Sequence, residues 1–141
     1  MSLVNDQFVR RQNMTENQKR ITLLPNSEIS NIYPQPEFNT HERSLYFTFN
    51  KIDWQLINAN HDHNSRLHLM LKLGYFKARH IIFKIDAMKS SDDIAHLQKK
   101  HFKGIEVNFK KLDPRTVKAQ KRDILDYFDY SEYTVLISVQ Y

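Results

Sequence analysis

Hydrophobic positions are densest between Asn64 and Phe83, where the chain reads N-S-R-L-H-L-M-L-K-L-G-Y-F-K-A-R-H-I-I-F. Apolar residues recur from Leu67 at i, i+3, i+4, i+7, i+8 and i+11, and others fill most of the remaining circumference. A helix that is apolar nearly all round belongs in a protein interior. The stretch predicts a core helix that Asn64 or Ser65 can cap. Gly74 costs about 1 kcal/mol in a helix interior, which indicates close approach of another helix there.

Weaker helical patterns precede this stretch. Thr15-Glu16-Asn17-Gln18 has the form of a capping box and predicts a short helix to about Leu24, which Pro25 ends. Pro36 can begin a helix that carries Phe38, Leu45 and Tyr46. Asn50 followed by Asp53 indicates a new helix start, and its apolar residues should pack on the core helix.

Two helices are predicted after the core helix. Ser90 or Ser91 caps the first, Asp92 and Asp93 in its first turn suit the helix dipole, and Gly104 ends it. Asp113-Pro114 starts the second, which should run to about Phe128. Its inward-facing residues are predicted to be Val117, Ile124 and Phe128.

The whole pattern predicts a mainly α fold, a compact bundle of five to six helices in a single domain over residues 1–141. A helix-turn-helix arrangement is compatible with it. Residues 1–13 are polar and are expected to form a disordered tail. Residues 105–109 alternate too briefly for a confident strand and are treated as an extended connection. Residues 133–141 are rich in β-branched residues, so helix and strand both stay open there.

Composition excludes several kinds of chemistry. The absence of cysteine rules out disulfides, thiolate metal ligands and a cysteine nucleophile. Gly74 and Gly104 are the only glycines, so a glycine-rich phosphate loop is not possible. No nucleophile motif or paired carboxylates are visible. We therefore expect neither an enzyme nor a cofactor. No apolar run is long enough to span a bilayer, and a cytoplasmic location is expected.

Charge is distributed unevenly along the chain. Residues 64–122 hold fifteen Lys and Arg against five Asp and Glu, whereas residues 123–141 hold four acidic residues and no basic one. Such a concentration is a candidate footprint for a polyanion. The alternative interpretation is an ordinary solvated surface, although exposed helix faces usually carry both positive and negative charges.

The sharpest candidate site is a basic stripe at i, i+4, i+7 and i+11 along the predicted 113–128 helix. Together with its flanking residues, it gives the following predicted DNA contacts: Lys110, Lys111, Arg115, Thr116, Lys118, Lys121 and Arg122. Lysines would contact phosphates, and arginines could also reach guanine edges in a major groove. A second cluster near the end of the core helix adds Lys72, Lys77 and Arg79, with His80 beside them. The alternative for this cluster is that cations in a last turn satisfy the helix dipole.

Two other groups of residues have a functional and a structural interpretation. His61, His63 and His68, with Asp62, could ligate a metal, but their spacing suits a solvated turn better, and no metal is predicted. The aromatic residues between Phe47 and Phe83 could stack on bases, but their helical spacing favours a place in the core.

Four segments in order carry a family resemblance. L-Y-F-T-F-N-K-I-D-W-Q-L-I (45–57) and N-S-R-L-H-L-M-L-K-L-G-Y-F-K-A (64–78) resemble the N-terminal region of the large replicative transposases of the Tn-three family. There, a Y-x-L-x-x-x-D-L-x-L-I helix precedes an N-R-L-G/H-F-x-L-x-L-G-Y-F/L-K/R helix. T-E-N-Q-K-R (15–20) is similar to that family's T-x-E-Q-R start. D-P-R-T-V-K-A-Q-K-R-D-I-L-D-Y-F-D-Y (113–130) is similar to its R-T-x-x-x-x-R-x-x-I-L-x-x-L-G-Y segment, with Asp129 in the position of the glycine.

The resemblance implies sequence-specific binding to the terminal inverted repeats of a transposon. It also implies a fragment or truncation of a larger transposase, because that family's catalytic acidic triad lies far downstream. The expected partner is double-stranded DNA in the bacterial nucleoid, and RNA stays open on charge alone. The rival interpretation is a protein-interaction module that contacts another transposase domain or protomer through residues 127–141. A small enzyme is the least supported alternative.

Overall fold

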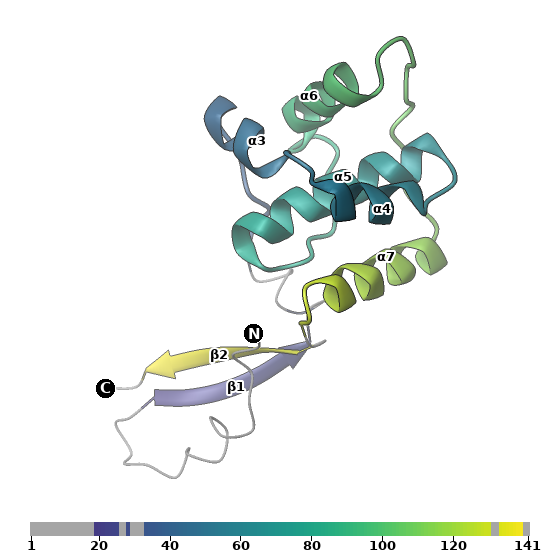
Figure 1. Ribbon diagram of the computed structural model, residues 1–141. Coiled ribbons are helices and arrows are strands. Elements are labelled where there is room, and N and C mark those ends of the chain that lie inside the picture. The colour runs from purple at the N-terminus through teal and green to yellow at the C-terminus, as the bar shows by residue number, and fades with distance from the viewer. Residues whose placement is uncertain (1–18, 26–27, 29–32, 131–132, 140–141) are drawn as a thin grey trace.

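The computed structural model describes residues 19–25, 28, 33–130 and 133–139. In this part of the chain, the elements are β1 (Lys19–Pro25), α3 (Thr40–Tyr46), α4 (Lys51–Asn58), α5 (His63–Arg79), α6 (Ser91–His101), α7 (Pro114–Tyr127) and β2 (Tyr133–Val139) (Figure 1). The predicted mainly α fold is confirmed. The segment at residues 105–109 is an extended connection, as expected.

Helix α5 is the centre of the fold. Every residue from Leu67 to Phe76 is buried, so the prediction of a core helix is confirmed. The helix ends earlier than its apolar pattern, because His80 adopts a left-handed conformation (φ 60°) and donates its N–H to the carbonyl of Phe76. Phe83 is still buried, but it lies in the extended segment that follows.

The start of α5 also differs from its prediction. Asp62 occupies the N-cap position, and neither Asn64 nor Ser65 does. The amide of Asn64 instead donates to the carbonyl of Lys110 and accepts from its N–H, at 3.0 and 3.1 Å. Asn64 therefore ties the start of α5 to the segment that leads into α7.

Gly74 is explained by a close aromatic neighbour. A Cβ at this position would overlap the ring of Phe47, the buried residue that ends α3. The predicted close approach is real, but a side chain makes it rather than the backbone of another helix.

The remaining helices cover α5 from different sides. In Figure 1, α3 and α6 lie above α5, α4 overlaps α5 in this view, and α7 lies below it. α7 runs in the same direction as α5. Its leading segment bonds to Asn64. Beyond its end, the rings of Phe128 and Tyr130 pack against Phe76 near the end of α5, the first tilted and the second edge-on.

Helix starts follow local capping rules. Asn50 caps α4, which starts where predicted, and Asp53 completes a capping box. Asp113 caps α7 with Pro114 at the first turn, also as predicted. α3 begins later than expected, because Asn39 and Glu42 form a capping box after Pro36. Gly104, with φ of 77°, lies in the turn after α6, which ends at His101.

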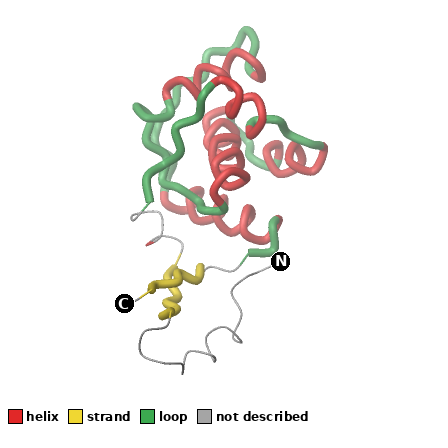
Figure 2. Tube along the Cα trace, turned by 90° about the vertical axis from the view of Figure 1, so that its left-hand side faces the viewer, coloured by secondary structure: helices red, strands yellow, loops and turns green. Residues whose placement is uncertain are grey.

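The strands correct one prediction and decide an open one. Residues 19–24 form part of β1 rather than a helix, since they pair antiparallel with β2 from Lys19↔Val139 to Pro25↔Tyr133. The capping box at 15–18 and the tail at 1–13 lie outside the described residues. Residues 133–139, for which helix and strand were open, form β2. Figures 1 and 2 both show this two-stranded sheet beside the helical body rather than inside it.

Asp93 has a larger role than helix-dipole electrostatics. Ser90 takes the N-cap position of α6 but makes no side-chain cap bond. Asp93 is 3% exposed, accepts a hydrogen bond from the Tyr75 hydroxyl at 2.6 Å, and pairs with Arg43 at 2.8 Å. Burial first, and then the bond to Asp93, raise the pKa of Tyr75. This cluster joins α3, α5 and α6.

Candidate nucleic-acid interface

Helix α7 has a fixed inner face. Ile124 and Leu125 are buried, and Gln120 is 2% exposed. The Gln120 amide donates to the Ser65 carbonyl at 2.9 Å and to Asn60 Oδ1 at 3.1 Å. These contacts fix which face of α7 is turned toward the start of α5.

The opposite face of α7 is basic. Arg115, Lys118 and Arg122 are exposed and Lys121 is half-buried, so the predicted stripe faces solvent. Arg122 makes a weak surface ion pair with its neighbour Asp123 at 3.4 Å. Val117 was predicted to face inward, but this is wrong. It is 42% exposed, because Gln120, rather than Val117, fills the contact with α5.

A groove of about 850 Å³ follows this face. It is lined by Arg115, Lys118, Lys121 and Arg122 on α7, and by Pro25 and Tyr130 at its end. Of the described residues that line it, Asp126 is the single acidic one. The groove therefore concentrates positive charge along one side of α7.

The two lysines before α7 are exposed on a rigid segment. Lys110 and Lys111 both face solvent. The backbone of Lys110 is held by Asn64 and by His68 Nε2, which lies 2.7 Å from its carbonyl oxygen. Thr116, another predicted contact, is half-buried and donates its hydroxyl to the capping Asp113 at 3.3 Å. The bond from the Thr116 N–H lowers the pKa of Asp113.

The second predicted cluster does not form one surface. Lys72 is 3% exposed and donates to Gln120 Oε1 at 3.0 Å. Lys77 pairs with Asp53 at 2.6 Å and lies over the ring of Phe49. Only Arg79 of the three is exposed. The prediction of Lys72 as a surface contact is therefore wrong. The sequence already indicated its burial, because a helix that is apolar all round leaves no exposed position for Lys72.

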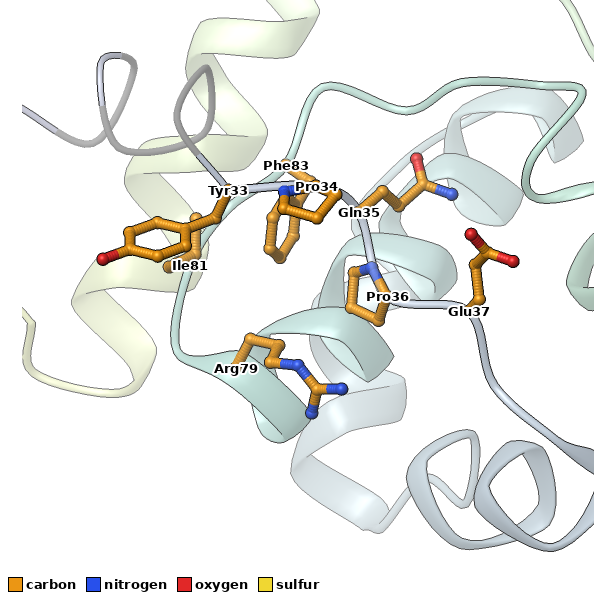
Figure 3. A pocket seen from close by; sticks show the side chains of 8 residues that line it. All are labelled: Tyr33, Pro34, Gln35, Pro36, Glu37, Arg79, Ile81 and Phe83. Atoms are coloured by element: carbon orange, nitrogen blue, oxygen red, sulfur yellow. The ribbon is translucent and has the colours of Figure 1, made fainter.

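Arg79 borders a separate cavity of about 490 Å³ (Figure 3). The segment from Tyr33 to Glu37 and the side chains of Ile81 and Phe83 also line it. Figure 3 shows the Arg79 guanidinium below Pro36. None of the α7 stripe residues lines this cavity, so Arg79 belongs to a different surface feature.

The histidines occupy three different environments. His61 is exposed, and His63 lies edge-on to Phe102 with ring centroids 5.5 Å apart. His68 is buried, and burial lowers its pKa to about 4. Within the described residues, no group of three His, Asp or Glu side chains could hold a metal.

Most of the aromatic residues lie in the core. Phe47, Tyr75, Phe76 and Phe83 are buried, and Phe49 packs edge-on against Trp54. This agrees with the structural interpretation of their spacing. Sequence reasoning missed one role. Asp53, taken only as part of a helix-start signal, is fully buried and accepts a hydrogen bond from the Tyr127 hydroxyl at 2.8 Å.

Most of the chain matches a known protein family. Residues 23–136 match the family described as "Domain of unknown function (DUF4158)". The chain belongs to this family. Neither curated proteins nor solved structures gave a match to this DUF4158 chain. Over the described residues, no helix of the DUF4158 chain combines the length and apolarity needed to cross a membrane.

Proposed function

We propose that this DUF4158 domain binds double-stranded DNA through the exposed face of α7, and that its target is the terminal inverted repeat of a transposon. One observation carries the proposal: Arg115, Lys118 and Arg122 share a face whose rotation is fixed by Gln120 on the opposite side. A fixed basic helix can place phosphate and base contacts in a defined register.

The family resemblance supplies the choice of DNA. The four similar segments follow the order of the N-terminal region of Tn-three transposases, and the last of them is α7 itself. The backbone at Asp129 supports the alignment, because its φ of 57° lies in the region that favours the glycine of the family motif. The domain itself would bind without cutting DNA.

The test is binding to a labelled duplex that carries the element's own terminal repeat, compared with a scrambled duplex across a salt titration. We expect preference for the repeat and a steep loss of affinity with salt, because each phosphate contact releases counterions. Equal binding to both duplexes would remove the assignment to transposon ends. Lack of binding at low salt would reject the DNA interface.

The two-stranded sheet favours one second candidate, a protein-interaction module. In the part of the chain that the structure describes, each of the seven-residue strands β1 and β2 pairs along one side only. Open strand edges can accept a strand from another chain. Such association would persist at high salt, where phosphate contacts weaken. A salt-resistant self-association or complex with another transposase domain would favour this candidate.

A further inference from the structure

A second cavity, of about 620 Å³, lies between α5, α7 and two of the segments that connect the helices. Its walls come from α5, from residues 82–85 and 87, from residues 109–112 and from α7. The volume is within the range of roughly 300–1,000 Å³ that small-molecule sites occupy. Arg115, Lys118 and Arg122, which carry the proposed DNA contacts of α7, do not line this cavity.

Among the residues that the structure describes, the charges that line the cavity have one sign. Five lysines line it and no described Asp or Glu does: Lys72, Lys84, Lys110, Lys111 and Lys121. The rest of the lining is mostly apolar. An apolar cavity with a few convergent cations fits an anion that also carries an apolar body.

Lys72 is the most informative of these lysines. It is 3% exposed, and the one partner found for its ammonium among the described residues is the neutral amide oxygen of Gln120. Burial lowers its pKa to about 8. A buried cation costs free energy unless an opposite charge compensates it, and such groups concentrate at functional sites. A bound anion would supply the missing charge.

An aromatic pair indicates the shape of the apolar part. Phe109 lines the cavity and stacks on His68, with ring centroids 4.2 Å apart and planes within 13°. His68 is held in turn by the Lys110 carbonyl. An aromatic ring that is supported by another ring, as Phe109 is by His68, is a suitable surface on which a planar ligand can stack, as nucleobases do on aromatic side chains.

We infer that this cavity binds a nucleotide, with its base against Phe109 and its phosphate among the lysines. The nucleotide has two sources, a free mononucleotide or an unpaired nucleotide of a DNA strand. Lys121 lines both this cavity and the basic groove, so a strand on α7 could deliver a base to it. The free-nucleotide form does not depend on the proposed DNA function, whereas the strand form rests on it.

The test is an NMR titration of the whole chain with 2′-deoxyadenosine 5′-monophosphate, with deoxyadenosine and inorganic phosphate as comparison ligands. We expect saturable shifts at Phe109, His68 and Ala87, and weaker binding of both comparison ligands. Lys72→Met should reduce affinity at least about tenfold, as for loss of a hydrogen bond to a charged group. Absence of saturable shifts at these residues would overturn the inference.

A second variant keeps the test decisive if Lys72→Met does not fold. Val117 lines the cavity from the exposed side of α7, so Val117→Trp should fill it without disturbing the core. Ile105→Trp is the matched control, because Ile105 is 46% exposed and does not line the cavity. Nucleotide binding that survives Val117→Trp unchanged would also overturn the inference.

Two duplexes then distinguish the sources. A duplex with one extrahelical adenine is compared with the same duplex without it. Tighter binding of the bulged duplex that Val117→Trp removes would identify a strand nucleotide, and mononucleotide binding without this preference would identify a free one. If the perfect duplex does not bind but the mononucleotide does, the proposed DNA function fails while the pocket stands.

Discussion

Two basic clusters lie on neighbouring parallel helices and behave differently. On α7, Arg115, Lys118 and Arg122 keep their charges in solvent. On α5, Lys72 and Lys77 turn theirs toward Gln120 and Asp53. The difference follows from burial: α7 packs along one side, whereas α5 is enclosed along most of its length. A run of positive charge in a sequence therefore indicates a binding surface only where the helix that carries it has a free face.

Reversing the α7 charges should give the largest effect. The triple variant Arg115→Glu, Lys118→Glu and Arg122→Glu should weaken duplex binding on the order of 100-fold or more, because three phosphate contacts become repulsive. Its thermal midpoint should change little, since these side chains are exposed. Electrophoretic mobility shifts and thermal unfolding measure the two quantities.

The matched control reverses three exposed lysines at and around α6, on the other side of α5: Lys89, Lys99 and Lys103 (Figure 1). It changes the net charge equally, so it should keep most of the affinity. Equal losses in both variants would mean that net charge, rather than the α7 face, drives binding.

Removing a charge from the α5 cluster should act on stability instead. Lys77→Met should lower the free energy of unfolding by about 2 kcal/mol, because it leaves the buried Asp53 carboxylate without its cation. Urea unfolding measures the loss, and duplex binding by the folded variant should be unchanged. The double variant Lys77→Met, Asp53→Asn should lose less free energy of unfolding than the two single variants together, because the two residues interact. If Lys77→Met weakened duplex binding and left the free energy of unfolding unchanged, Lys77 would be a DNA contact after all.

The buried ammonium of Lys72 predicts a pH dependence. Its pKa is lowered to about 8 in the folded chain, against about 10.4 when unfolded. Between these values the unfolded chain binds the proton that the folded chain has lost, so the free energy of unfolding rises with pH. From about pH 7.5 to about 9.5, the wild type should gain about 1–2 kcal/mol relative to Lys72→Met. If the free energy of unfolding changed equally with pH in the two proteins, the Lys72 ammonium would not be an uncompensated buried charge.

The ends of the two helices offer the smallest test. α5 and α7 are each followed by a residue with positive φ, His80 at 60° and Asp129 at 57°. Asp129→Gly should raise stability by roughly 0.5 kcal/mol, because glycine adopts this conformation without strain. The same change at Asp126, inside α7, should lower it by about 0.5 kcal/mol. Thermal unfolding of both variants compares them, and a loss at both positions would refute the conformational argument.

Local signals predicted the fold best. The starts of α4 and α7 depend on residues close together in the sequence, Asn50 with Asp53 and Asp113 with Pro114, and both starts were predicted correctly. Residues 19–24 were assigned to a helix in error, because their pairing partners lie more than 100 residues away in β2. No local pattern contains that information.

Like the fold, the candidate site could be predicted from the sequence only where the signal was local. The periodicity of Arg115, Lys118 and Arg122 was enough to place them on one face. The inward position of Gln120 was not apparent, because it depends on the Ser65 carbonyl and on Asn60 of other segments. The cavity was also missed, since its lysines come from four separate stretches of the chain.

The pairing of Lys19 with Val139 has a consequence for architecture. Paired residues on antiparallel strands lie about 5 Å apart, so the polypeptide enters and leaves the described region at the same point. Any segments joined to its two sides would begin as neighbours. A domain attached in this way can be inserted into, or removed from, a longer protein while its flanking parts remain adjacent.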